Sequence, residues 1–213
     1  MADWTGRAEP LTEDGFKAAC ERLRCFPFVL WAVLRVETSG CGFRPDRSLQ
    51  RRFEPHIFRR NTGMSLPTLA EAIEADRIGA IRATSWGIGQ VMGFNAEMVG
   101  YRQNGAEGMV ATFADFEDAQ LAAMAEFCVQ TGAALHLRNR DWAKFARVYN
   151  GPAYKDNDYD GKLSRASITA AGRLPDLAVR AEQVRLMFAG YYTGALDGLD
   201  GPKTRQARLR FCS

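Results

Sequence analysis

Residues 26–40 read Phe-Pro-Phe-Val-Leu-Trp-Ala-Val-Leu-Arg-Val-Glu-Thr-Ser-Gly, and this stretch decides the fold. Pro27 suits the first position of a helix, because its φ is already helical and its missing N–H is not needed there. Residues 28–34 are apolar on every side, which indicates a helix that runs through a protein core. Gly40 is a helix stop signal. Glu37 therefore lies where a buried helix emerges, among apolar neighbours.

Helical patterns dominate the rest of the chain. Residues 11–24 offer Thr12 as an N-cap and carry apolar side chains at the spacing of one helical face. Residues 41–65 read as irregular, with at most a short hairpin within 41–60. Three glycines between Thr84 and Gly93 predict a tight course close to another segment. The fold class we expect is mainly α, with further helices over residues 66–82, 95–101, 113–137, 141–149, 176–189 and 203–211.

The composition is that of an ordinary folded protein. The 213 residues are 46% hydrophobic and 25% charged, which excludes a disordered chain, a fibre and a disulfide scaffold. No apolar run approaches the roughly 18 residues that a membrane span needs. The sequence pattern changes near residues 172–175, where Gly172 and Pro175 interrupt the helical pattern. This change predicts a body over 1–172 and a small appendage over 176–213.

The net charge of +3 is small, and no nucleic-acid-binding motif is present, so we expect no nucleic-acid partner. The N-terminus lacks a basic start followed by an apolar core, so we expect no secretory signal. Five cysteines, an odd number without a C-x-x-C pair, predict free thiols in a cytoplasm. An arginine-rich loop is either simply solvated or binds an anionic partner. Its arginines are Arg44, Arg47, Arg51, Arg52, Arg59 and Arg60.

Glu37 has two interpretations from its position alone. It can cap the helix end or pair with a nearby arginine. Alternatively, burial raises the pKa of such a carboxyl, which then stays protonated and serves as a general acid.

Three short motifs follow one another along the chain: Glu37-Thr38-Ser39-Gly40, Gly87-Ile88-Gly89-Gln90 and Tyr149-Asn150-Gly151. This order resembles the lysozyme-like superfamily. Longer segments more closely resemble the phage and prophage N-acetylmuramidase family of endolysins, and the resemblance spans about residues 11–170. These segments are residues 36–43, 53–58, 85–95 and 141–154.

The resemblance implies cleavage of the β-1,4 bond between N-acetylmuramic acid and N-acetylglucosamine in peptidoglycan, with Glu37 as the general acid. An inverting hydrolase also needs a base that activates water. Glu54 is the first candidate and Asp46 the second, although Glu54 could instead form an ion pair with a neighbouring arginine. Without a side-chain base, the substrate's own acetamido group or 6-hydroxyl would act, and the latter gives a lytic transglycosylase.

The same resemblance suggests residues that contact the saccharide. Ser85 and Gln90 would line the binding site, because a glutamine amide can both donate to and accept from an acetamido group. Tyr149 and Asn150 would orient Glu37 or touch the sugar. Trp86 would either stack on a sugar face or fill the core. Gln90 could instead stabilise its turn, and Tyr149 and Asn150 could be a core tyrosine and a helix-stop asparagine.

We expect no metal or cofactor, because His56 and His136 lack metal-ligand spacing. Residues 183–211 resemble the first half of a peptidoglycan-binding helical module, through Gly190-Tyr191-Tyr192-Thr193-Gly194 and Gly201-Pro202-Lys203-Thr204. This segment would bind the wall or only pack against the body.

The sequence thus predicts a monomeric endolysin that waits in the host cytoplasm until lysis and then acts on peptidoglycan glycan strands, without inserting into a membrane. The rival functions are a lytic transglycosylase, a chitinase-like hydrolase and a non-catalytic wall-binding or phage structural protein.

Overall fold

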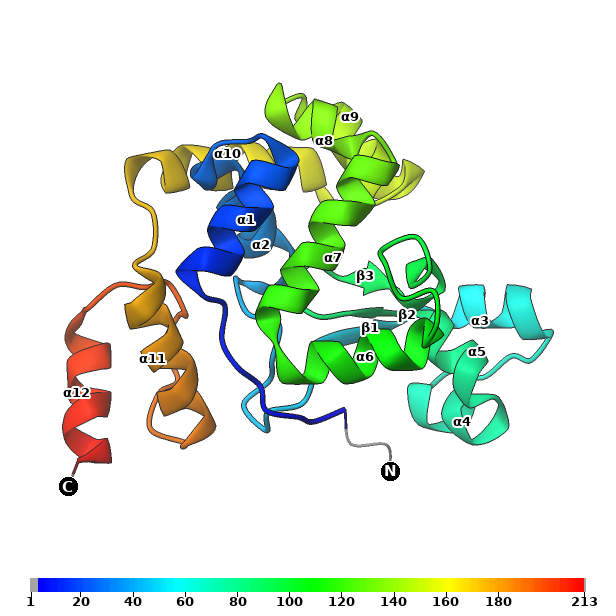
Figure 1. Cartoon of the computed structure of the whole chain (residues 1–213), viewed down its shortest axis with the longest axis horizontal. Coiled ribbons are helices and arrows are strands. Elements are labelled where there is room, and N and C mark those ends of the chain that lie inside the picture. The colour runs from blue at the N-terminus through cyan, green and yellow to red at the C-terminus, as the bar shows by residue number, and fades with distance from the viewer. Residues whose placement is uncertain (1–3, 213) are drawn as a thin grey trace.

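A computed structural model describes residues 4–212 and confirms a mainly α fold (Figure 1). The helices surround one small antiparallel sheet. The elements in chain order are α1 (Glu13–Leu23), α2 (Pro27–Thr38), β1 (Arg51–Phe53), α3 (Pro55–Thr62), α4 (Leu69–Ala75), α5 (Arg77–Arg82), β2 (Thr84–Trp86), β3 (Val91–Met92), the 3-10 helix η1 (Gly93–Asn95), α6 (Gly105–Asp115), α7 (Glu117–Gln130), α8 (Ala133–Arg138), α9 (Trp142–Tyr149), the 3-10 helix η2 (Pro152–Asn157), α10 (Tyr159–Gly172), α11 (Leu177–Phe188) and α12 (Pro202–Phe211).

Helix α2 runs through the core, as predicted. Pro27 is its first residue, and every side chain from Val29 to Leu34 is buried. It packs against α10 along much of its length and also contacts α1 and α8. Each fully buried Val or Leu contributes about 1.5–3 kcal/mol relative to exposure, so α2 is held firmly up to its exit near Glu37.

Helix α1 also matches the prediction. The Thr12 hydroxyl accepts the backbone N–H of Gly15 at 3.0 Å and so caps the helix. Phe16 and Leu23 belong to its buried stripe, which packs on α7.

The glycine-rich segment 84–93 forms a β-hairpin, a structure that the sequence pattern did not reveal. Strand β2 pairs with β1 on one side and β3 on the other, with Arg52 opposite Ser85. The hairpin turn lies against α7, where a side chain at Gly87 or Gly89 would collide with Gln120 or Met124. The close approach predicted from the glycines is therefore confirmed.

The single helix predicted over 113–137 was wrong, because three helices, α6, α7 and α8, cover this region. Phe116 is extended, since its neighbour Glu117 donates its N–H to the Glu9 carbonyl at 3.0 Å and the two segments form a bridge. Gly132 has a φ of +78°, which ends the next helix.

Three other element predictions were also wrong. The helix expected over 95–101 is absent, because the 3-10 helix η1 ends at Asn95 and turns follow it. The helix expected over 66–82 divides into α4 and α5 at Asp76, whose carboxylate accepts the Gly79 N–H at 2.8 Å and caps α5. The irregular stretch 41–65 contains β1 and α3. A short hairpin does begin at 43–49, where Phe43 bridges Leu49.

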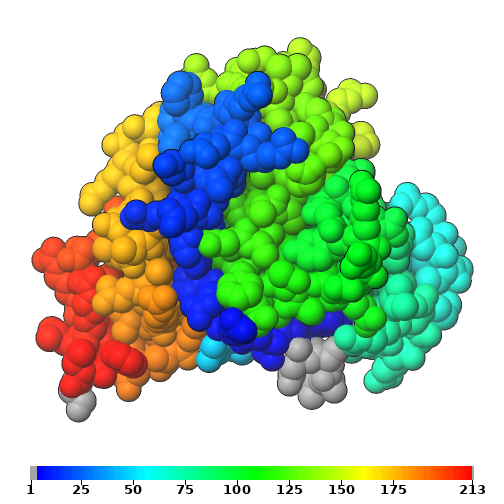
Figure 2. Space-filling view, in the orientation of Figure 1, coloured from blue at the N-terminus to red at the C-terminus, as the bar shows by residue number. Residues whose placement is uncertain are grey.

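The C-terminal helices α11 and α12 lie on the opposite side of the molecule from α3–α5 (Figure 1). In the space-filling view α11 lies against the body, and α12 lies on the outer side of α11 (Figure 2). Within residues 4–212, every helix is too short or too polar to cross a lipid bilayer.

Candidate active site

Glu37 occupies the last turn of α2 and is only partly exposed. The Tyr159 hydroxyl, at the start of α10, donates a hydrogen bond to Glu37 Oε1. The next residue, Thr38, donates from Oγ1 to the Ile88 carbonyl at 3.0 Å, which joins the end of α2 to the turn of the β2–β3 hairpin. The carboxyl group thus has a hydrogen-bond donor in Tyr159 and, among residues 4–212, no guanidinium within ion-pair distance.

Burial raises the pKa of Glu37 from 4.5 to about 7, although the hydrogen bond from Tyr159 and the positive charge of Arg52 both act to lower it. Cys128 and Tyr149 lie close enough to interact electrostatically with Glu37. A carboxyl with a pKa near 7 exchanges its proton readily at neutral pH, and this is the property that a general acid requires.

Arg52 pairs with Glu54 and acts electrostatically on Glu37. Its Nε lies 3.0 Å from Glu54 Oε1, and its charge also acts on Glu37. Glu54 precedes α3, and its side chain is 21% exposed. His56 Nδ1 lies 3.6 Å from the other Glu54 oxygen. The structure therefore forms the arginine pair that the sequence allowed for Glu54, and the arginine of that pair is near enough to lower the pKa of Glu37.

Asp46, the second candidate base, takes part in its own turn. Its Oδ1 accepts from the Ser48 N–H at 3.0 Å and from the Ser48 hydroxyl at 2.7 Å. These two bonds lower the pKa of Asp46.

Ser85 and Gln90 meet in the hairpin. The Ser85 hydroxyl donates to Gln90 Oε1 at 2.9 Å, and Gln90 Nε2 donates to the Gly87 carbonyl at 2.8 Å. Ser85 lies opposite Arg52 across the β1–β2 pair. Gln90 has a φ of +49°, which is unusual for a residue with a side chain. These contacts bring the hairpin turn, Arg52 and the end of α2 together.

Tyr149 and Asn150 lie at the end of α9. The Tyr149 hydroxyl donates to the Gly89 carbonyl rather than to Glu37. Asn150 is exposed at the C-cap.

The residue that contacts Glu37 is Tyr159, which sequence reasoning missed. Tyr159 belongs to no recognised motif and reaches Glu37 only because α10 packs along α2.

Trp86 lies in the core. Its side chain is fully buried, its Nε1 donates to the Ile81 carbonyl at 3.0 Å, and its ring packs edge-on against Trp4 with centroids 4.8 Å apart. A ring enclosed in this way has no face free for a sugar, so the core-filling alternative is the correct one for this structure.

Two hollows occur elsewhere on the surface. One, of about 280 Å³, lies at Gly100–Asn104, and the other, of about 360 Å³, lies between the N-terminal segment and the end of α11. Glu37 lines neither of these two hollows. Among residues 4–212 no group of three His, Cys, Asp or Glu side chains is arranged to hold a metal ion.

Comparison with known proteins identifies the family of this chain. A profile of the N-acetylmuramidase family matches residues 27–68 and 63–170. The crystal structure of Burkholderia AP3 phage endolysin is similar at 32% sequence identity with a TM-score of 0.66, and the match covers 76% of this chain and 71% of that one. No curated protein matches the sequence. The chain therefore belongs to the N-acetylmuramidase family and is a glycoside hydrolase that acts on peptidoglycan.

Proposed function

We propose that Glu37 is the general acid that protonates the glycosidic oxygen between N-acetylmuramic acid and N-acetylglucosamine. The observation that carries this proposal is the burial of the Glu37 carboxyl at the exit of α2, which raises its pKa to about 7. The hydrogen bond from Tyr159 limits the directions in which the carboxyl can turn. A positioned acid with this pKa delivers its proton as the bond breaks.

Glu54 is the proposed base, which takes a proton from the attacking water. Arg52 supports this role, because one guanidinium is paired with Glu54 and also acts electrostatically on Glu37. In inverting glycosidases the two carboxyl groups stand roughly 6.5–9.5 Å apart and leave room for a water molecule. On this mechanism the product keeps an ordinary reducing end.

Ser85, Gln90, Tyr149 and Asn150 are the proposed contacts to the glycan. The Gln90 amide is held by Ser85 and Gly87, so its orientation is set before substrate arrives. The Asn150 amide is exposed at the end of α9 and free to approach a sugar. A phage enzyme of this kind would act as a monomer and remain in the host cytoplasm until lysis exposes the wall.

The test is a digest of purified sacculi in ¹⁸O-labelled water, followed by mass spectrometry of the products. A hydrolase places one labelled oxygen on each new reducing-end muramic acid. A product with an anhydro end and no added water would instead identify a lytic transglycosylase.

Substitutions of Glu37 and Glu54 test their proposed roles as acid and base. We expect Glu37→Gln to lower kcat on the order of 100-fold or more, since an amide cannot donate an acidic proton. Glu54→Gln should lower it by a similar order if Glu54 is the base. Glu74→Gln, on the exposed face of α4, is the matched control. Full activity in a folded Glu37→Gln protein would refute the assignment.

A further inference from the structure

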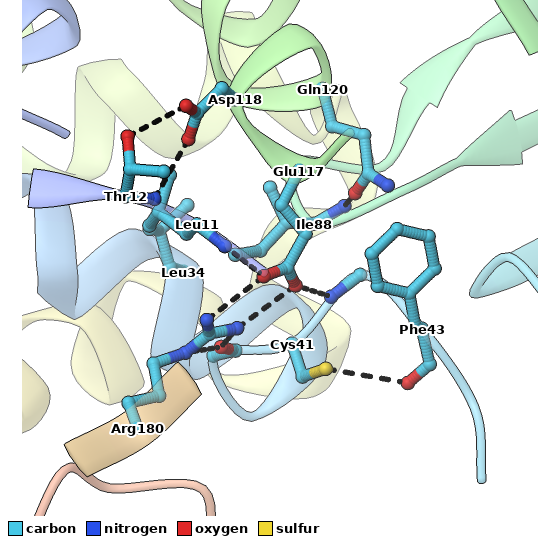
Figure 3. Close-up of polar contacts among 12 residues, drawn as sticks. Leu11, Thr12, Leu34, Cys41, Phe43, Ile88, Glu117, Asp118, Gln120 and Arg180 are labelled. Carbon is cyan, nitrogen blue, oxygen red and sulfur yellow. Dashed lines mark hydrogen bonds and ion pairs between the residues drawn. The ribbon is translucent and has the colours of Figure 1, made fainter. Parts of the chain in front are cut away.

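Glu117 and Arg180 form an ion pair with no exposure of either side chain. Arg180 Nη1 lies 2.9 Å from Glu117 Oε2, and Nη2 lies 2.9 Å from Oε1. Each carboxylate oxygen also accepts one backbone N–H, from Leu11 at 2.7 Å and from Gly42 at 2.7 Å (Figure 3). The pair thus joins α7 and α11 to two irregular segments of the body.

Arg180 also donates hydrogen bonds to the carbonyl oxygen of Gly40. Its Nε donates to this oxygen at 2.9 Å and its Nη2 at 2.6 Å. Gly40 ends the turn that closes α2, where its N–H donates to the Leu34 carbonyl at 2.9 Å. Its φ is +83°, and a side chain there would approach Trp31 to within 2.9 Å. Arg180 therefore holds the backbone three residues after Glu37.

The opposite side of this turn is held by the hairpin. Thr38 donates to the Ile88 carbonyl, and the Ile88 N–H donates to Gln120 Oε1 at 2.7 Å. Residues 38–42 therefore lie between the β2–β3 turn and the Arg180 guanidinium. A shift on either side would move the last turn of α2.

The chemical reason for an ion pair at this position lies in the backbone. The chain at Leu11, Gly40 and Gly42 is irregular and buried, and its polar groups need partners because a buried unpaired N–H or carbonyl is costly. A guanidinium supplies several donors in a fixed plane, and a carboxylate supplies acceptors. An apolar pair of the same size would leave these groups without partners.

Helix α11 has two different faces. Leu177 and Val184 join the main core of the body, whereas Leu186 packs with Tyr192 and Ala207 of the C-terminal segment. Gln183 Oε1 accepts the Gly198 N–H at 2.9 Å and ties that segment to α11. The appendage is thus anchored in the body through α11.

We infer that Arg180 is a positioning residue for Glu37, and that α11 belongs to the catalytic unit rather than to a separable wall-binding module. The inference rests on the proposed role of Glu37. It extends that role to a residue outside the segment that matches the family profile, which ends at 170.

The test compares Arg180→Lys, which keeps the charge but loses the planar fork, with Arg185→Lys, an exposed position on the same helix. In Arg180→Lys we expect kcat to fall about 10- to 100-fold with KM within about twofold, since small displacements of a catalytic group are this costly. The alkaline limb of the pH profile should move to lower pH, because a looser turn lets water reach Glu37. Arg185→Lys should match the wild type in all three measurements.

A second readout is independent of activity. Cys41 is buried between Gly40 and Gly42, so the rate at which iodoacetamide alkylates it reports opening of this segment. We expect Arg180→Lys to accelerate alkylation of Cys41 about tenfold or more and to leave Cys20, buried on α1, unchanged. Peptide mass spectrometry separates the two sites.

Several results would overturn the inference. One is a folded Arg180→Lys protein whose kcat, alkaline limb of the pH profile and rate of Cys41 alkylation all equal those of the wild type. Another is equal acceleration at Cys20, which indicates global loosening. If Arg180→Lys does not fold, the double variant Glu117→Gln/Arg180→Met takes its place, and failure of both to fold assigns the pair to global stability only. Retained activity in Glu37→Gln refutes the proposed function, whereas Cys41 labelling still tests the positioning.

Discussion

Replacing Glu37 with glutamine should stabilise the protein at alkaline pH. The carboxyl has an ordinary pKa of 4.5 and a folded-state pKa of about 7. Each unit of difference corresponds to about 1.4 kcal/mol, so ionised Glu37 costs the folded state about 3 kcal/mol. Glutamine keeps an oxygen that can accept from Tyr159 but carries no charge, so it avoids this cost.

The sign of the pH dependence follows from proton binding. Between the two pKa values the folded state holds the proton more tightly, so this group's contribution to stability falls as pH rises from 4.5 through about 7. From about pH 5 to about pH 8 the wild type should lose roughly 2.5 kcal/mol through Glu37, and the Glu37→Gln protein should not. Groups that do not interact with Glu37 contribute equally to both proteins and cancel in the comparison.

Urea unfolding of both proteins across this pH range measures the effect. The free energies of unfolding should nearly coincide at the acidic end and diverge in favour of Glu37→Gln at the alkaline end. Glu74→Gln is the control for removing a negative charge at an exposed position. A constant difference between wild type and Glu37→Gln at every pH would show that the Glu37 carboxyl is not desolvated, and the argument for a general acid would fail with it.

Three further outcomes are expected. Tyr159→Phe should move the alkaline limb of kcat/KM to higher pH, because it removes a hydrogen bond that lowers the pKa of Glu37; a limb that moves to lower pH would contradict this. Trp86→Ala should lower the free energy of unfolding by about 3–5 kcal/mol, as for other large core residues, with the loss measured by urea unfolding; a surface role would leave it nearly unchanged. Gln90→Gly should have a free energy of unfolding about 1 kcal/mol higher than that of Gln90→Ala, because glycine adopts a positive φ without strain. Equal unfolding free energies would show that the backbone at this position is not strained.

The sequence by itself determined the parts of this protein that depend on local patterns. The apolar run after Pro27 specified a buried helix and placed Glu37 at its exit, because a helix apolar on all sides is stable only inside a core. Thr12 was predicted to cap the first helix, and it does so. The order of the short motifs indicated the family that the comparisons then confirmed.

Tertiary structure alone decided the surroundings of Glu37. Tyr159 and Arg180 come from helices that follow the last motif, and each reaches the end of α2 only because α10 and α11 pack there. The break at Phe116 also depended on a distant partner, because it forms a bridge to the N-terminal segment. Local periodicity describes one element at a time. The pKa of a carboxyl and the exit angle of a helix depend on groups that are distant in the chain and become neighbours only on folding.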